Sequence, residues 1–484
     1  MAVADVASAP STKPRNTITV TDNRTGKTVE IDISDNSVPA SAFLQFKAPY
    51  AEGERHENDT PYGLRILDPS FFNTAMIKSE ITYIDGNKGF LMHRGYPIEQ
   101  LAEKSSFLET AYLLIYGELP SKSQFSLWSW EIMNHTFVAE DLQTMIHHMR
   151  YDAHPMSIFI SSFAAMAAFA PEANPSLHGQ DMYITDKAVM NKQIVRILGK
   201  ATTIAAMAYR IRINRPFNPP RADLSYTENL LYMMDRMVEP YSYRPDPRLA
   251  KALDILFILH ADHEMNCSTS TMVHVGSSLV DPYSCISAAA SALYGPLHGG
   301  ANEAVIRMLT KIGSVENVIP FLEQVKQKKE LLFGFGHRVY RETDPRSKVI
   351  REVADMVFEV CGREPLIDVA IALKDAALKD EYFTSRKLFP NVDYWSGLIY
   401  KAMGFPLDFY PVLFVVPRVA GYLAHWKQQL DSGKNKISRP RQVYVGKSRR
   451  DYVPIDEREE REIDGYNGLN AIPHYISMRR LTKI

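Results

Sequence analysis

The stretch "PIEQLAEKSSFLETAYLLIYGELP", residues 97–120, decides the fold class. Its apolar residues recur at the three- and four-residue spacing of an amphipathic helix. The stretch closes at Gly117 and Pro120, residue types that typically end helices. We therefore predict helical structure from Ile98 onward, and the same spacing continues through most of the chain that follows.

The helical pattern dominates the remainder of the sequence. It recurs at residues 121–147, 156–169, 187–213, 225–238, 247–265, 282–294, 301–313, 316–331, 345–361, 365–378, 395–403 and 411–430. Strand patterns are nearly absent after residue 95, and no repeat of 20–50 residues indicates a solenoid. The sequence predicts a mainly α fold with a large helical body.

Two hairpins are predicted ahead of this body. The segment "TITVTDNRTGKTVEIDI", residues 17–33, alternates apolar and polar residues around a polar centre that contains Gly26. The segment "ITYIDGNKGFLMHRG", residues 81–95, contains the turn signal Asp85-Gly86. We expect a disordered tail at 1–16, followed by a β-rich N-terminal region at 17–97.

Composition narrows the class of protein. The chain has 484 residues, 45% hydrophobic and 23% charged, which is ordinary for a globular protein of two or three domains. A net charge of -1 offers no basic field for nucleic acid. Cys267, Cys285 and Cys361 lie far apart, which fits a reducing compartment without a disulfide framework. No run of about 18 apolar residues predicts a membrane span.

The two ends of the sequence bear on its location in the cell. The start, "MAVADVASAPSTKPRNT", lacks the apolar core of a secretion signal, and Asp5 makes it a poor transit peptide. The last three residues, Thr482-Lys483-Ile484, loosely resemble the peroxisomal address Ser-Lys-Leu. We expect a cytoplasmic or peroxisomal protein rather than a mitochondrial one.

Four segments stand apart from this helical background. Two of them contain histidines whose role the residues alone leave open. In "LHADHEMN", residues 259–266, His260 and His263 are three apart and would share one helix face. They could bind a metal, but no third ligand follows at a suitable spacing. In "YGPLHGGANEA", residues 294–304, His298 lies between a rigid Pro-Leu pair and two glycines, which an ordinary turn would also explain.

The other two segments are "GFGHRVYRETDPRSK", residues 334–348, and "FPNVDYWSG", residues 389–397. The first lacks the spacing of a phosphate-binding loop. Asp393 in the second could be a satisfied helix cap. The order of the four segments is a more specific functional signal than any single segment. Two glycine-flanked histidines are followed by a carboxylate, with arginines downstream.

Together these segments resemble the citrate synthase family, from about residue 64 to about residue 446. Further matching segments are "YIDGNKGFLMHRGYPIEQLA", "DAHPM", "ILHADHEMNCSTST", "GFGHRVY" with "DPR", "PNVD" with "SGLIY", and "AHW" before "SRPRQVY". The likeness is greatest to the form found in bacteria and in peroxisomes of plants and fungi. It implies a two-domain helical fold, with a large domain at 98–309 and 412–446, a small domain at 310–411 and a C-terminal arm at 447–484.

The resemblance also implies an activity. Citrate synthases condense acetyl-CoA with oxaloacetate and hydrolyse the citryl-CoA thioester to citrate and CoA, as in the tricarboxylic acid and glyoxylate cycles. This chemistry uses no metal and no cofactor apart from the CoA thioester, which is a substrate. The family further implies a homo-oligomer, expected to be a dimer with shared active sites, and a smaller domain that closes over the substrates.

Carried over by motif, the resemblance assigns seven residues. Asp393 is the base that removes a proton from the thioester α-carbon, His298 hydrogen-bonds the thioester oxygen, and His337 polarises the ketone of oxaloacetate. The expected oxaloacetate-binding residues are His263, Arg346 and Arg418, with Arg439 contributed by the partner subunit. Bidentate arginines match the charge and geometry of two carboxylates. We expect His260 to be structural.

Two departures from the bacterial and peroxisomal pattern leave alternatives open. Arg341-Glu342-Thr343 replaces the usual Lys-Asn-Tyr, and Tyr394-Trp395 replaces the usual Phe-Tyr, both beside the expected acyl-CoA pocket. An alternative is therefore an alkylcitrate or 2-methylcitrate synthase that takes a longer acyl-CoA, in secondary or propionate metabolism. A catalytically inactive binding protein and a zinc hydrolase built on His260 and His263 are hypotheses from other classes.

Overall fold

The computed structural model describes residues 16–50, 62–336, 339–340, 342, 344–447 and 449–459. Its contacts divide the chain into two compact units. One unit is Met1–Met76 with Pro440–Ile484, and the other is Ile77–Arg439. The domain boundaries that the resemblance implies within the helical region stay a prediction.

The first unit contains the first predicted hairpin. Strands β1 (Thr17–Asp22) and β2 (Lys27–Asp32) pair antiparallel, with Ile18 opposite Ile31. Gly26 lies in the turn with a φ of +73°, a conformation that residues with a β-carbon rarely adopt. The described residues of this unit also contain short 3-10 turns at Ala40–Gln45, Pro69–Phe71 and Ile455–Glu457.

The second unit begins with the second predicted hairpin. Strands β3 (Thr82–Asp85) and β4 (Phe90–His93) pair antiparallel, and β5 (Tyr96–Pro97) pairs with β4. Thr82 lies directly opposite His93 in this register. The turn between β3 and β4 begins after Asp85, as the sequence predicts.

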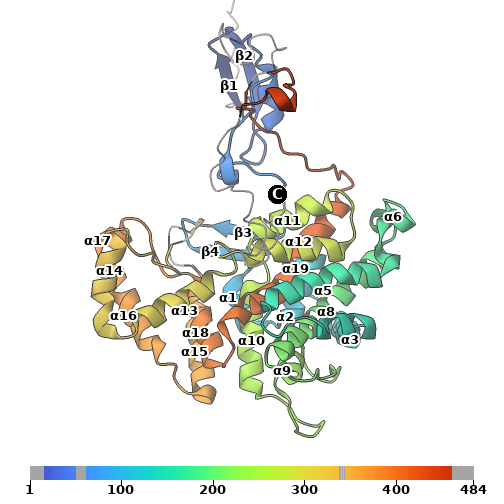
Figure 1. Ribbon diagram of the computed structural model, residues 1–484, viewed down its shortest axis with the longest axis vertical. Coiled ribbons are helices and arrows are strands. Elements are labelled where there is room, and N and C mark those ends of the chain that lie inside the picture. The colour runs from blue at the N-terminus through green and yellow to red at the C-terminus, as the bar shows by residue number, and fades with distance from the viewer. Residues whose placement is uncertain are drawn as a thin grey trace, which may run out of the picture. The chain divides into compact units, whose positions relative to one another are not determined.

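Helices make up the rest of the second unit, which confirms the predicted mainly α fold (Figure 1). They are α1 (Ile98–Lys104), α2 (Phe107–Tyr116), α3 (Lys122–Asn134), α4 (Glu140–His147), α5 (Pro155–Phe169), α6 (Pro175–His178), α7 (Met182–Thr185), α8 (Lys187–Arg212), α9 (Tyr226–Asp235), α10 (Pro247–His260), α11 (Cys267–Gly276), α12 (Pro282–Tyr294), α13 (Ala301–Ile312), α14 (Val318–Lys326), α15 (Arg346–Cys361), α16 (Leu366–Lys379), α17 (Glu381–Thr384), α18 (Val392–Ala402) and α19 (Tyr410–Asp431).

The helix predicted at 247–265 differs from the structure in a way that affects the site. The expected helix at 247–265 ends at His260, and a separate helix, α11, starts at Cys267. The side chain of Asn266 caps α11 by accepting a hydrogen bond from the backbone N–H of Thr269 at 3.1 Å. His260 and His263 therefore do not share a helix face, because His263 lies in the connection between the two helices.

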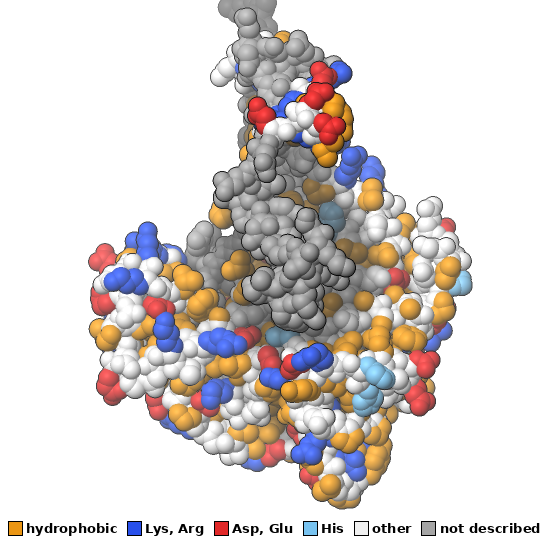
Figure 2. Space-filling view, in the orientation of Figure 1, with side chains coloured by type: hydrophobic (Ala, Val, Ile, Leu, Met, Phe, Trp, Pro, Cys, Tyr) orange, Lys and Arg blue, Asp and Glu red, His pale blue; other side chains and the backbone are white. Residues whose placement is uncertain are grey.

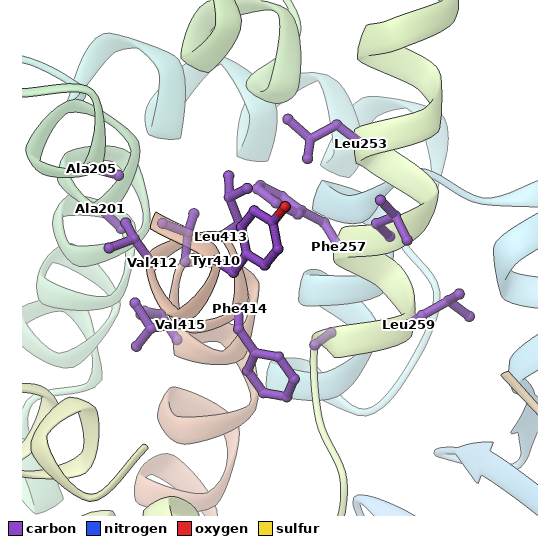
Figure 3. Packing of buried hydrophobic residues seen from close by; sticks show 14 of the residues in the cluster. Ala201, Ala205, Leu253, Phe257, Leu259, Tyr410, Val412, Leu413, Phe414 and Val415 are labelled. Atoms are coloured by element: carbon purple, nitrogen blue, oxygen red, sulfur yellow. The ribbon is translucent and has the colours of Figure 1, made fainter. Parts of the chain in front are cut away.

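Helix α19 forms the centre of the buried core. It packs against α2, α8, α10, α11 and α12. Figure 3 shows Phe257 of α10 pointing toward Leu413 of α19, while Val412 lies on the side of α19 that faces Ala201 of α8. Although no membrane span is predicted from the sequence, the segment Leu407–Asp431 is long and apolar enough to cross a membrane. However, 89% of its most apolar window is buried inside the molecule. It is therefore a core helix of the second unit.

The surface and the cysteines agree with the composition. Figure 2 shows lysine and arginine side chains interspersed with acidic ones on the visible face of the second unit. Cys285 is buried, whereas Cys267 and Cys361 are exposed, and all three are free thiols.

Candidate active site

Two of the predicted oxaloacetate arginines meet at the C-terminal end of α10. Arg418, on α19, donates from Nε to the carbonyl oxygen of His260 at 2.7 Å, and Arg346 donates from Nη1 to that of Leu259 at 3.5 Å. The last carbonyls of a helix have no partner within the helix and carry partial negative charge, so they attract cations. Both guanidinium groups are buried, with 1% exposure for Arg418 and 3% for Arg346.

The two arginines differ in their counter-charges. Asp344 holds Arg346 in a bidentate pair, with Oδ1 3.0 Å from Nε and Oδ2 2.8 Å from Nη2. Burial opposes the charge of Arg346, but Asp344 outweighs it and raises the pKa of Arg346. Burial lowers the pKa of Arg418, which has no ion pair among the described residues. Its guanidinium carbon lies 4.7 Å from the ring centre of Phe414. Arg418 is therefore a buried cation suited to receive the carboxylate of a ligand.

His263 follows α10 directly and lies in the same region. Its Nε2 is 3.2 Å from the hydroxyl of Tyr340, and its side chain is 9% exposed. The next residue, Glu264, has a φ of +55°, which is uncommon for a residue with a side chain. The backbone is turned sharply at the point where it presents His263.

His298 lies in the turn between α12 and α13. The Ser268 hydroxyl is 2.9 Å from His298 Nε2 and 2.8 Å from Asn266 Oδ1. Burial, and secondarily the charge of Arg418, lowers the pKa of His298 to about 4, so the ring is neutral at neutral pH. The Ser268 hydroxyl donates its single proton to Asn266 Oδ1, so its oxygen accepts from His298 Nε2. If that hydroxyl turns toward Nε2, the ring proton moves to Nδ1, which becomes the donor available to a ligand.

Glycine 299 allows this turn to pack closely. Gly299 donates its backbone N–H to the carbonyl of Leu293 at 2.8 Å. A β-carbon at position 299 would lie 2.4 Å from Cδ2 of Leu293, closer than real contacts allow. The glycine beside His298 is needed for close approach and not for an unusual backbone angle.

Asp393 lies in the first turn of α18 but is not its cap. The cap is Asn391, whose side chain accepts from the backbone N–H groups of Asp393 at 3.0 Å and Tyr394 at 3.3 Å. Asp393 Oδ1 is buried and has no hydrogen-bond partner among the described residues. Burial raises the pKa of Asp393 to about 6, although the charge of Arg346 opposes this change. A carboxylate with a raised pKa is a stronger base than one in water.

The segment that leads to His337 pairs with the segment that leads to Asp393. Gly336 donates its N–H to the carbonyl of Phe389 at 2.8 Å, and Asn391 donates from Nδ2 to the carbonyl of Gly336 at 3.0 Å. Gly334 and Gly336 have φ values of +76° and +79°, so glycine is required at both positions. His337 itself lies outside the described residues.

The remaining candidate residues do not join this group. Arg439 is exposed at the end of the second unit, and its contribution to a partner's site stays a prediction. His260 is fully buried, with Nδ1 2.7 Å from the carbonyl of Leu256, and burial lowers the pKa of His260 to about 3. Tyr394 donates its hydroxyl to the carbonyl of Ala370 at 2.8 Å. Within the described part of the chain, no group of three or more His, Cys, Asp or Glu side chains could hold a metal.

Sequence reasoning missed three residues that shape this site. Asn266 binds Ser268, Ser268 contacts His298, and Asp344 neutralises Arg346. An Asn before a helical stretch is a cap signal that indicates the start of α11. No comparable signal marks Ser268, because its contact with His298 joins residues 30 positions apart.

Comparison with known proteins agrees with the fold and the motifs. Residues 70–441 match the family described as "Citrate synthase, C-terminal domain". A citrate synthase of Dictyostelium discoideum is 54% identical over 97% of this chain and 90% of its own length. A peroxisomal citrate synthase of the same organism is 56% identical over 92% of this chain and 88% of its own.

Solved structures give the same result. The citrate synthase of Thermoplasma acidophilum, in a ternary complex with carboxymethyl-CoA and oxaloacetate, has a TM-score of 0.73 and 31% identity. The match covers 80% of this chain and 98% of the archaeal one. On these grounds, the chain belongs to the citrate synthase family.

Proposed function

We propose that this protein condenses acetyl-CoA with oxaloacetate and water to give citrate and CoA. One observation carries the proposal: a buried carboxylate oxygen of Asp393, which has no hydrogen-bond partner among the described residues, lies in the electrostatic field of two buried arginines, Arg346 and Arg418. A base with a raised pKa beside cations suits a reaction that removes a proton from a neutral thioester and adds the carbanion to a dianionic ketoacid.

Each residue has a role in the proposed reaction. Asp393 removes a proton from the α-carbon of the thioester. His298, held by Ser268 and neutral, donates a hydrogen bond to the thioester oxygen, where negative charge develops. Such a preorganised donor contributes about 3–4 kcal/mol to transition-state stabilisation. His337 is proposed to polarise the ketone and to protonate the new alkoxide.

Oxaloacetate binding is proposed to involve the end of α10. Arg418 has no carboxylate partner among the described residues, so a substrate carboxylate would provide its counter-charge. Arg346 directs Nη1 to the C-terminal end of α10, while Asp344 binds the other side of the guanidinium group. His263 completes this group, and Arg439 is proposed to come from the partner subunit of a homodimer.

The identified relatives support acetyl-CoA as the substrate and the peroxisome as the location. Both Dictyostelium proteins are named citrate synthases, and one is named peroxisomal. The alternative of an alkylcitrate or 2-methylcitrate synthase is not favoured. The side chain of Tyr394, one of the departures that suggested it, is buried with its hydroxyl bonded to α16.

Release of the CoA thiol from acetyl-, propionyl- and hexanoyl-CoA, each with oxaloacetate, tests this function. We expect kcat/KM for acetyl-CoA to exceed that for either longer thioester by at least about tenfold. Omission of oxaloacetate is the control, because release should then stop. A longer thioester that matches acetyl-CoA would favour the alternative, and no release with any thioester would contradict both.

A further inference from the structure

A buried carboxylate outside the proposed catalytic group joins three parts of the second unit. Asp262 lies in the connection after α10, immediately before His263, and is fully buried. Thr82 of β3 donates its hydroxyl to Asp262 Oδ2 at 2.5 Å, and His425 Nε2 of α19 lies 3.3 Å from the same oxygen. One carboxylate therefore links the sheet, the α10–α11 connection and the core helix.

The donor and acceptor of each hydrogen bond from β3 and β4 to Asp262 can be assigned. A carboxylate only accepts, so the Thr82 hydroxyl proton is directed to Asp262. The Thr82 oxygen must then accept from His93 Nδ1, which lies 2.9 Å away on β4. Burial lowers the pKa of His93 to about 4, so its ring is neutral and carries one proton, on Nδ1. The hydrogen bonds run from His93 through Thr82 to Asp262.

Asp262 remains charged in this buried position. Burial by itself would raise the pKa of Asp262, but pairing with His425 and the hydrogen bond from Thr82 outweigh burial and lower the pKa to about 2. A buried charge is tolerated only when it is paired and hydrogen-bonded. The donors concentrate on Oδ2, which fixes the orientation of the carboxylate.

This carboxylate holds the turn that presents His263. The backbone N–H of Glu264 donates to Asp262 Oδ2 at 3.2 Å, and Glu264 has the left-handed φ of +55°. Residues with side chains adopt this conformation rarely, and it persists where the surroundings enforce it. His263 lies between the two residues that this hydrogen bond joins, so the direction of its ring depends on Asp262.

The opposite side of Asp262 is closed by helix backbone. The N–H of Gly421 on α19 donates to the carbonyl of Ala261 at 3.1 Å. A β-carbon at position 421 would lie 2.4 Å from Asp262 Oδ1 and 2.5 Å from the Ala261 carbonyl oxygen. The turn is thus clamped between α19 and the sheet, which leaves little room for Asp262 to move.

We infer that Asp262 is a positioning residue for oxaloacetate: it holds His263 in the orientation that binds the ketoacid. The inference rests on the proposed function, in which His263 contacts oxaloacetate. Thr82 acts through Asp262 by holding its carboxylate. Neither residue is expected to affect the acyl-CoA side of the site.

Asp262→Asn tests the inference, because it keeps the shape and removes the charge. We expect KM for oxaloacetate to rise about tenfold or more, since a buried network loses a charged acceptor, while KM for acetyl-CoA changes less than about twofold. Asp254→Asn is the matched control. Asp254 is a half-buried carboxylate on α10 that accepts from the backbone N–H of Phe107 at 3.2 Å. Its loss should affect stability and leave both KM values within about twofold.

A second pair of variants keeps the test decisive if Asp262→Asn does not fold. Thr82→Val removes the hydroxyl with little change of shape, and Thr82→Ser retains it. We expect Thr82→Val to raise KM for oxaloacetate about threefold or more, and Thr82→Ser to restore the wild-type value. A purely structural role for Thr82 would lower stability without this selective change in KM.

The outcomes separate the inference from the function on which it rests. Absence of CoA release by the wild-type protein with acetyl-CoA and oxaloacetate would contradict the proposed function itself. An active wild type whose folded Asp262→Asn or Thr82→Val variant keeps KM for oxaloacetate within about twofold would overturn the positioning role alone. A parallel rise of both KM values would overturn it as well.

Discussion

The carboxylate of Asp393 owes its basicity to its surroundings. Its Oδ1 has no partner in the described part of the chain, because Asn391 takes over the capping of α18 that an Asp near a helix start could provide. The same burial that raises the pKa of Asp393 lowers that of His298 to about 4. At neutral pH this pair supplies an anionic base and a neutral donor.

These values predict the pH dependence of activity. Asp393 acts as a base only when ionised, and its pKa is raised from 3.8 to about 6. kcat/KM should therefore rise with pH through about 6 and fall about tenfold per pH unit well below it, whereas His298 stays neutral over this window. Initial rates between about pH 5 and pH 8 would measure this. Samples returned from acid to neutral pH before assay control for unfolding, and a flat profile down to about pH 5 would contradict the assignment.

How far individual residues could be predicted depends on where their partners lie. The flanking glycines and prolines of His298 and Asp393 are visible in the sequence, so both could be singled out. Asp262 could not, because its role comes from Thr82, 180 residues away in the chain, and from His425, 163 residues away. Such contacts leave no periodic or local signal.

At the scale of elements, caps determine where the site residues fall. Periodicity predicts that the chain from 247 to 265 is helical, yet α10 ends at His260, and the cap at Asn266 starts α11. The predicted helix at 395–403 starts three residues earlier, at Val392, because Asn391 caps it. Hydrophobic spacing locates a helix, whereas hydrogen bonds of polar side chains set its ends.

Asn391 should be important for both stability and rate. Asn391→Ala removes the cap of α18 and the bond from Nδ2 to Gly336, so we expect a loss of about 1–2 kcal/mol in the free energy of unfolding. Because these contacts also align Asp393 with the segment before His337, kcat should fall about tenfold or more. Urea unfolding and steady-state rates would measure the two effects.

Asn174→Ala is the matched control for this variant. Asn174 caps α6 by accepting from the backbone N–H of Ser176 at 2.9 Å. The Asn174→Ala variant should lower the free energy of unfolding slightly and leave kcat unchanged. An equal effect of both variants on kcat would show that the cap of α18 has no special connection to the chemistry.

At the scale of the whole molecule, the hydrophobic pattern predicts the class of fold but not its division. Both hairpins and the helical body were predicted, yet the first hairpin belongs to one compact unit and the second to the other. Hairpin signals are local and do not indicate which distant segments a hairpin contacts. The segment Leu407–Asp431, which contains α19, shows a similar limit. No membrane span is predicted there from the sequence, yet its length and composition would allow one, and its burial identifies it as a core helix.

We propose above all that Asp393 is the base of an acetyl-CoA condensation. The most direct measurement is the rate of CoA release from acetyl-CoA and oxaloacetate by Asp393→Asn, compared with the wild type and with Asp254→Asn. We predict that kcat of Asp393→Asn falls by about 10²–10⁴ while both KM values stay within about threefold. A variant that keeps kcat within about tenfold of the wild type would contradict the account.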